Sequence, residues 1–214
     1  MRFHHNHAPR SHSEFMRSFC DASTCCSPGS TAYLFFSLAM ILPDWMHIVC
    51  LGMAQTFVAC ALLEMCQYGT FGYERVAVAE SRSRLTLQLR SAFMEFQEWA
   101  SLVSKHHSQE SFTIATLNLT SDSCISPKRC TTFKGKAFNT MVCVQWLASI
   151  SSTTDSDRHK RLRAHLLSAL SRQWDLFERQ KALYFSESEA ALYCRDASRV
   201  MSASKLLFLE SYGR

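Results

Sequence analysis

A long apolar run, Tyr33 to Met65, is the feature that most limits what this chain can fold into. One acid, Asp44, and one histidine, His47, lie near the middle of the run. Burying such groups costs free energy unless they are paired, so their presence in an apolar run calls for a reason. Pro43 breaks the run, because a proline disfavours helical geometry at the residue before it. We therefore predict a helix that begins at Pro43 and Asp44 and ends near Gln67.

The remaining sequence also predicts helices. Its 214 residues include only 6 Gly and 4 Pro, too few for the many turns of a sandwich or barrel. Apolar residues at helical spacing predict further helices over residues 73–106, 133–150, 158–184 and 187–212. Residues 112–119 are short and β-rich, which favours a strand-like or extended connector. The predicted fold class is mainly α, an irregular bundle of five or six helices.

The last predicted helix has two informative patterns. Ser186 and Glu189 form a capping box that opens it. Beyond the box, apolar and small residues recur at helical spacing, and we expect them to face the core: Ala190, Cys194, Ala197, Met201 and Leu206.

The domain organisation follows from where these patterns begin. Residues 1–30 mix histidines, serines, cysteines and an SPGS turn with scattered apolar residues, which is typical of a flexible arm. Residues 31–214 are predicted to form a single helical domain, with a loop over 121–132.

The cysteines and the start of the chain indicate an intracellular protein. There are 10 Cys and no CxxC pair, and Cys50, Cys60 and Cys66 lie in apolar helical surroundings, where free thiols behave as small hydrophobes. The polar start, Met1–Arg10, is unlike a secretory signal, so we expect a nuclear or cytoplasmic location rather than secretion. The N-terminal His and Cys residues match no standard zinc spacing, and we expect neither metal nor cofactor.

A membrane span is an alternative interpretation of the apolar run. The stretch Trp45–Leu63 is about the minimum length for a bilayer core. His47 and Gln55 lie inside it, Asp44 and Glu64 lie at its edges, and no Lys/Arg cluster flanks it. We therefore prefer a buried core helix, and keep membrane association through residues 33–65 as a second alternative.

Asp44 and His47 are three residues apart, so on a helix they share one face and can bond to each other or to a common ligand. The block PDWMHIVCLGMAQTFVACALLEM, which carries them and the pair Leu51-Gly52, resembles a block in transposon-encoded DDE-type transposases of the CACTA or Plavaka kind. The later segments FKGKAFNTMVCVQWLA and ASRVMSASKLLFLESY are similar to helical segments of such proteins. The resemblance implies that Asp44 and His47 occupy a transposase-like motif near an RNase H-like catalytic core.

The carboxylates of such a core are incomplete here. Two-metal chemistry needs at least two converging carboxylates. Asp44 and Glu64 are separated by about 30 Å on one predicted helix at 1.5 Å per residue, so they cannot share an ion. No strand block with a first catalytic Asp precedes Asp44. We therefore expect a non-catalytic remnant or fragment of a larger, transposase-like protein, and a binding protein rather than an enzyme.

The partner classes follow from charge. The net charge of +5 is mildly basic, and the best basic cluster is the segment DRHKRLR, with four cations that are candidates for contacting phosphates: Arg158, Lys160, Arg161 and Arg163. No aromatic residues interleave with them, so base stacking is not predicted. The predicted function is weak, non-specific nucleic-acid or protein binding. The alternative is a helical protein-interaction or scaffold module.

Overall fold

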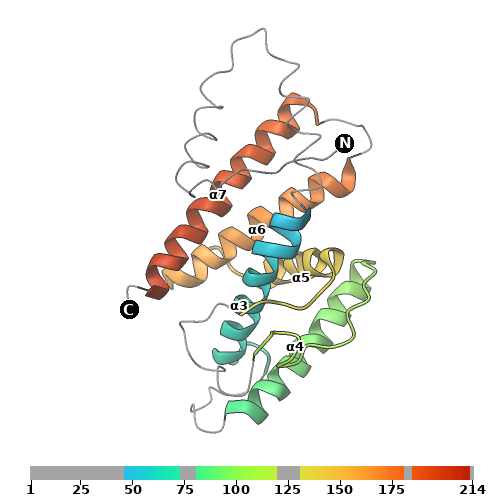
Figure 1. Ribbon diagram of the computed structural model, residues 1–214, viewed down its shortest axis with the longest axis vertical. Coiled ribbons are helices and arrows are strands. Elements are labelled where there is room, and N and C mark those ends of the chain that lie inside the picture. The colour runs from blue at the N-terminus through green and yellow to red at the C-terminus, as the bar shows by residue number, and fades with distance from the viewer. Residues whose placement is uncertain (1–45, 73–80, 120–130, 181–184, 213–214) are drawn as a thin grey trace, which may run out of the picture. The chain divides into compact units, whose positions relative to one another are not determined.

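The computed structural model describes residues 46–72, 81–119, 131–180 and 185–212, all within one compact unit, Trp45–Arg214. The fold of these residues is mainly α, as predicted, and they contain no β-strand. The predicted arm over residues 1–30 and Asp44 lie outside them, as does the loop predicted over 121–132 except for its last two residues. Figure 1 shows the helices, which are η1 (Met46–Met53), α3 (Ala54–Gln67), α4 (Ser81–Leu102), α5 (Ala137–Ile150), α6 (Arg158–Arg179) and α7 (Glu187–Tyr212).

The first helix begins with a π-helical segment, η1, which continues directly into α3. Helix α3 ends at Gln67, as predicted. Gly69 then turns the chain with a φ of 70°, a backbone conformation that residues with a side chain rarely adopt. The pair Leu51-Gly52 has a structural role here. A Cβ at Gly52 would lie 3.3 Å from the carbonyl oxygen of His47, so glycine lets the backbone approach closely.

Helix α5 is the centre of the unit. It contacts η1, α3, α4 and α6, and its residues are buried without interruption from Asn139 to Leu147. Trp146 of α5 packs against aromatic rings from three other segments, at centroid distances of 5.8 Å to Phe71, 5.5 Å to Phe96 and 5.8 Å to Phe112. A helix that is buried on all sides is typical of a core that other helices surround.

Helix α5 begins at Ala137 rather than at residue 133. The amides of Phe133 and Lys134 donate to the carbonyl oxygens of Gln55 and Thr116, at 3.0 Å and 2.6 Å. These bonds tie the segment to two other parts of the chain in an extended course, so its residues cannot also make the bonds of a helical turn.

The strand-like connector predicted over residues 112–119 is wrong. The segment forms turns, in which the amide of Leu117 donates to the carbonyl of Thr113 at 3.1 Å and the Thr116 hydroxyl accepts from the Thr113 amide at 2.7 Å. Asn118 has a φ of 53°, which no strand accommodates. Threonine side chains that bond to nearby backbone therefore override the β-propensity of the segment.

Helices α6 and α7 lie side by side (Figure 1). They run antiparallel, because His159 at the start of α6 meets Glu210 near the end of α7. Helix α6 ends at Arg179, five residues before the predicted end. The capping box opens α7 as predicted: the Glu189 amide donates to Ser186 Oγ at 3.3 Å, and the Ser186 amide donates to Glu189 Oε2 at 2.7 Å.

The face of α7 that packs on α6 is not the predicted one. Val200 and Ala203 are buried on it, together with Asp196, which receives two hydrogen bonds of 2.8 Å from Arg172 of α6. The predicted stripe lies on other faces, where Met201 is 44% exposed and Leu206 is 36% exposed. We call five half-buried or exposed positions the outer seam of α7: Ala190, Cys194, Ala197, Met201 and Ser204.

Candidate functional site

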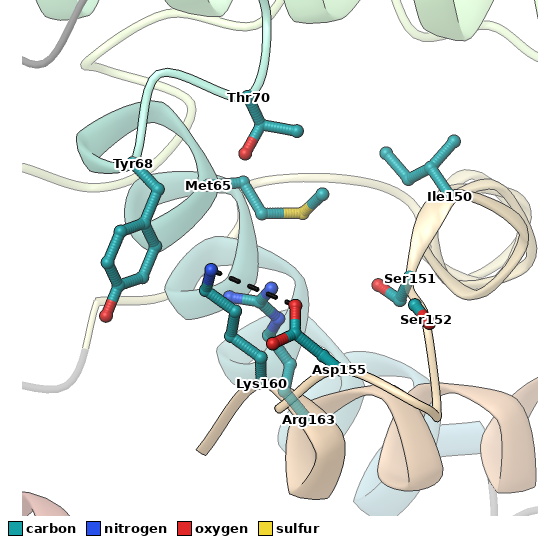
Figure 2. Close-up of a pocket in the computed structure, with 9 residues that line it drawn as sticks. All are labelled: Met65, Tyr68, Thr70, Ile150, Ser151, Ser152, Asp155, Lys160 and Arg163. Carbon is teal, nitrogen blue, oxygen red and sulfur yellow. Dashed lines mark ion pairs between the residues drawn. The ribbon is translucent and has the colours of Figure 1, made fainter. Parts of the chain in front are cut away.

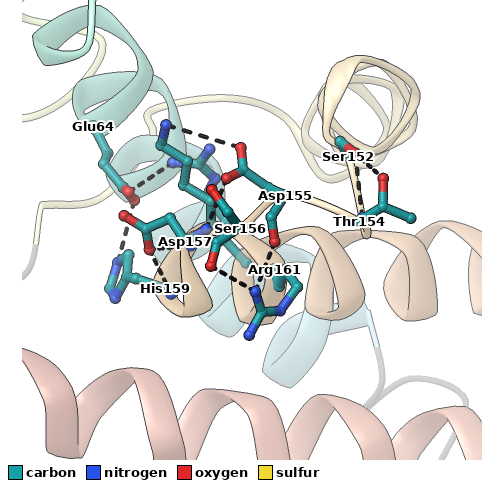
Figure 3. Close-up of polar contacts among 10 residues, drawn as sticks. Glu64, Ser152, Thr154, Asp155, Ser156, Asp157, His159 and Arg161 are labelled. Atoms are coloured by element: carbon teal, nitrogen blue, oxygen red, sulfur yellow. Dashed lines mark hydrogen bonds and ion pairs between the residues drawn. The ribbon is translucent and has the colours of Figure 1, made fainter.

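The most distinctive polar feature of the described residues is a junction of charged side chains from three helices. Figure 3 shows Glu64 of α3 beside the start of α6, where the backbone turns from the loop of residues 151–157 into the helix. Glu64 is a lone acid in the apolar helix α3, and the basic segment of α6 lies against it. We call this group the charged junction: Glu64, Arg158, His159, Arg163 and Glu210.

The loop before α6 fixes where the cations of the junction point. The carboxylate of Asp157 accepts hydrogen bonds from the amides of His159 at 2.8 Å and Lys160 at 3.3 Å, which caps the helix. These amide bonds, that of Lys160 first, hold the pKa of Asp157 below its ordinary value. The Arg161 guanidinium donates to the carbonyls of Asp155 and Ser156, both at 2.7 Å.

Two basic residues of α6 bind Glu64. Arg163 Nη1 lies 2.8 Å from Glu64 Oε1, and His159 Nε2 lies 3.4 Å from Glu64 Oε2. The side chain of Arg163 is only 11% exposed, so this ion pair is largely withdrawn from water. Burial alone would raise the pKa of Glu64, but the hydrogen bond from His159 and the charge of Arg163 lower it overall.

The same histidine reaches α7. His159 Nδ1 lies 3.3 Å from Glu210 Oε2, and Arg158 Nε lies 3.1 Å from Glu210 Oε1. The hydrogen bond to Glu64, with the charges of both acids, raises the pKa of His159 even though its partial burial acts in the opposite direction. The junction therefore links α3, α6 and α7 through one imidazole.

A small cavity of about 150 Å³ lies beside the junction (Figure 2). Lys160, Asp155 and Arg163 gather on one side of it, and Lys160 Nζ is 3.9 Å from Asp155 Oδ2 and 4.7 Å from the centre of the Tyr68 ring. Since a water molecule needs about 10–15 Å³ of such space, the cavity has room for several. The remaining lining residues are Met65, Thr70, Ile150, Ser151 and Ser152.

The structure brings together the four cations predicted from sequence but gives each an intramolecular partner. Arg158 binds Glu210, Lys160 lies near Asp155, Arg161 binds backbone carbonyls, and Arg163 binds Glu64. Among the cations of the junction, Arg158 has the most accessible side chain, which is 66% exposed. Phosphate binding by these cations stays a prediction.

Of the two residues of the transposase-like motif, only His47 can be placed. It is exposed in the first turn of η1 and is not one of the junction residues, whereas Asp44 lies outside the described residues. Within the described residues, no group of three or more His, Cys, Asp or Glu side chains is placed to hold a metal ion.

The sequence indicated the bases of the junction and not its acids. Glu64 is the one acid between residues 45 and 67, but no spacing along the chain connects it to the basic segment of α6. Glu210 lies far away along the chain, and no spacing connects it to α6.

Helix His47–Gln67 is, by length and composition, apolar enough to cross a membrane, which is weak evidence because core helices pass the same test. Comparison of the chain with protein-family models, with curated proteins and with solved structures found no match.

Proposed function

We propose that this chain is a non-catalytic helical interaction module, a remnant of a transposase-like protein, and that the outer seam of α7 binds the same helix of a second copy. The observation that carries the proposal is the placement of α7. Among the described elements this long helix contacts only α6, and on another face it carries Cys194 and Met201 exposed to solvent.

The spacing of the outer seam supports a helical partner. Its five positions, Ala190 to Ser204, alternate steps of four and three residues, which is the spacing that two helices use when they pack in a coiled coil. A second copy supplies an identical α7, and a twofold pairing places the same patch on both sides of the interface. The small residues at three of the positions let two helix backbones approach.

The charge balance of the α6 segment favours this function over a phosphate-binding one. Glu64, Glu210 and Asp155 already lie against the cations of that segment. A phosphate backbone would have to displace these acids, which costs part of the electrostatic gain.

The test is the oligomeric state of the purified chain, measured by sedimentation equilibrium over a range of concentrations and at low and high salt. We expect a monomer–dimer equilibrium that changes little with salt, because the seam is apolar. Met201→Glu should weaken it by at least about tenfold, since the carboxylate would be buried unpaired in the interface.

Leu206→Glu is the matched control, because Leu206 is on the same helix, has similar exposure and faces roughly 140° away at 3.6 residues per turn. It should leave the equilibrium unchanged. A chain that stays monomeric at every concentration, or equal weakening by both variants, would contradict the proposal.

Weak nucleic-acid binding is the second candidate function, and the exposed side chain of Arg158 favours it. Binding to a DNA duplex should then fall steeply as salt rises, because displaced counterions drive such binding. Arg158→Gln should weaken it, while Arg90→Gln, an exposed cation on α4, should not. Binding that ignores both salt and Arg158 would reject this candidate.

The transposase-like ancestry has a test of its own. The genomic sequence upstream of the codon for Met1 should encode a strand-rich block with an Asp, as in an RNase H-like core. A parent reading frame with an unrelated domain at that place would remove the ancestry and leave the interaction function to stand on α7.

A further inference from the structure

We propose that His159 is a proton-dependent lock, which in its charged form fastens the C-terminal end of α7 to α3 and in its neutral form lets that end go. This inference is independent of the proposed dimer. It rests on the position of one imidazole between two carboxylates that belong to different helices, Glu64 of α3 and Glu210 of α7.

The protonation state decides how many of these contacts are favourable. A charged imidazole has two N–H donors, one for each carboxylate. Nε2 is 3.4 Å from Glu64 Oε2, and Nδ1 is 3.3 Å from Glu210 Oε2. A neutral imidazole has one N–H, so one carboxylate must face a nitrogen lone pair, and acceptor faces acceptor there. The neutral form can hold one helix or the other, not both.

The neighbouring charges decide which helix is released. Glu64 keeps Arg163, whose side chain is nearly buried, so the bond between α3 and α6 survives loss of the proton. Among the described residues, Glu210 then keeps Arg158 alone, whose side chain is largely in water, and such pairs contribute little. Two further charged residues of the described chain lie beside His159, Asp157 and Lys160. The Asp157 carboxylate accepts hydrogen bonds from the amides of His159 and Lys160. Loss of the proton therefore releases the C-terminal end of α7 rather than α3.

The packing of α7 agrees with this direction. Among the described elements, the backbones of α3 and α7 do not lie next to each other, and the imidazole of His159 reaches an acid of each. Toward its end α7 also exposes the large apolar side chains Leu206 and Leu209. Ala203 is its last buried residue among those described, and Leu207 is partly buried against the core. Few buried contacts mean that a segment opens at low free-energy cost.

The experiment is amide hydrogen exchange of residues 203–210 in the full chain between pH 5.5 and 8, corrected for the intrinsic pH dependence of exchange. Protection of this segment should fall as pH rises through the titration of His159. One pKa unit of difference between closed and open states corresponds to a tenfold change in the opening equilibrium, so the fall should be on the order of tenfold per unit.

Variants separate the lock from a general loss of stability. His159→Gln should abolish the pH dependence of residues 203–210, and Glu210→Gln should reduce their protection at low pH while leaving α3 protected. His165→Gln, at an exposed histidine of the same helix, is the matched control and should behave as the parent chain.

A direct titration covers the case in which His159→Gln fails to fold. The imidazole of His159, followed by NMR, should lose its proton at a lower pH in the Glu210→Gln chain than in the parent chain. Protection of residues 203–210 that does not change with pH, pH dependence that survives His159→Gln, or a titration of His159 unaffected by Glu210→Gln would each overturn the proposal.

Discussion

At the scale of single residues, one of the ion pairs between α6 and α7 depends on a buried acid, Asp196. Asp196 is 2% exposed and receives two hydrogen bonds from Arg172 and one, at 3.1 Å, from Arg199. Arg172→Met should therefore lower the free energy of unfolding by about 1.5–3 kcal/mol, as expected for lost bonds to a charged group. Arg199→Met, which removes a single bond, should cost less than about 1 kcal/mol. Thermal unfolding of both variants checks the order, and equal losses would contradict it.

Asp196 also predicts how the free energy of unfolding changes at low pH. The hydrogen bonds from Arg172, ahead of the charges of Arg172 and Arg199, lower the pKa of Asp196 despite its burial. A lowered pKa in the folded state contributes stability that is present above the ordinary carboxyl pKa of about 4 and is lost as pH falls through the folded value. Urea unfolding from pH 6 down to pH 3 should show this loss in the parent chain and a smaller one in Asp196→Asn.

Single residues also show the limits of prediction from sequence. The basic segment was visible because its cations are adjacent in the chain. The acids that neutralise it, Glu64 and Glu210, belong to helices that are distant in the sequence, and no local pattern predicts that they lie beside it. A cluster of like charge indicates a patch, but only the fold tells whether opposite charges cover it.

At the scale of elements, the capping box of α7 makes a local prediction. Ser186→Ala removes the hydroxyl that accepts from the Glu189 amide, and it should destabilise the protein by about 1 kcal/mol. Ser188→Ala is the control, because the hydroxyl of Ser188 contacts only Ser186 Oγ, at 3.2 Å, and it should cost a few tenths of that. Thermal melting measures both, and a larger loss for Ser188→Ala would show that the box does not hold the helix start.

The elements themselves follow from sequence more closely than their faces do. Caps and turns, such as Ser186 and Gly69, are local and mark helix ends in the right places. The buried face of α7 is not local. The apolar stripe at Met201 competes with a face that contains Asp196 beside Val200 and Ala203. That face is the buried one, because Arg172 of α6 binds the acid. Hydrophobic periodicity cannot anticipate a buried ion pair.

At the scale of the whole molecule, Trp146 is the centre of the aromatic core. Its ring packs against Phe71 in the turn after α3, Phe96 of α4 and Phe112 in the segment that follows α4. Trp146→Ala should lower the free energy of unfolding by about 3–5 kcal/mol, because the cavity left behind cannot close. Trp99→Ala, at a partly exposed tryptophan that stacks on Phe96 at 6.4 Å, should cost clearly less. Urea unfolding followed by circular dichroism compares the two, and similar losses would contradict this account of the core.

The central position of α5 also has a consequence for how the chain is made. Its partners η1, α3 and α4 precede it in the sequence, whereas α6 follows it. A ribosome adds about 5–20 residues per second. When α5 is made, the helices that cover one side of it have already been synthesised, whereas the other side stays uncovered until α6 has emerged. A nascent chain that stalls or ends near Ile150 would thus present an apolar helix to chaperones and to other nascent chains, and synthesis of α6 closes that period.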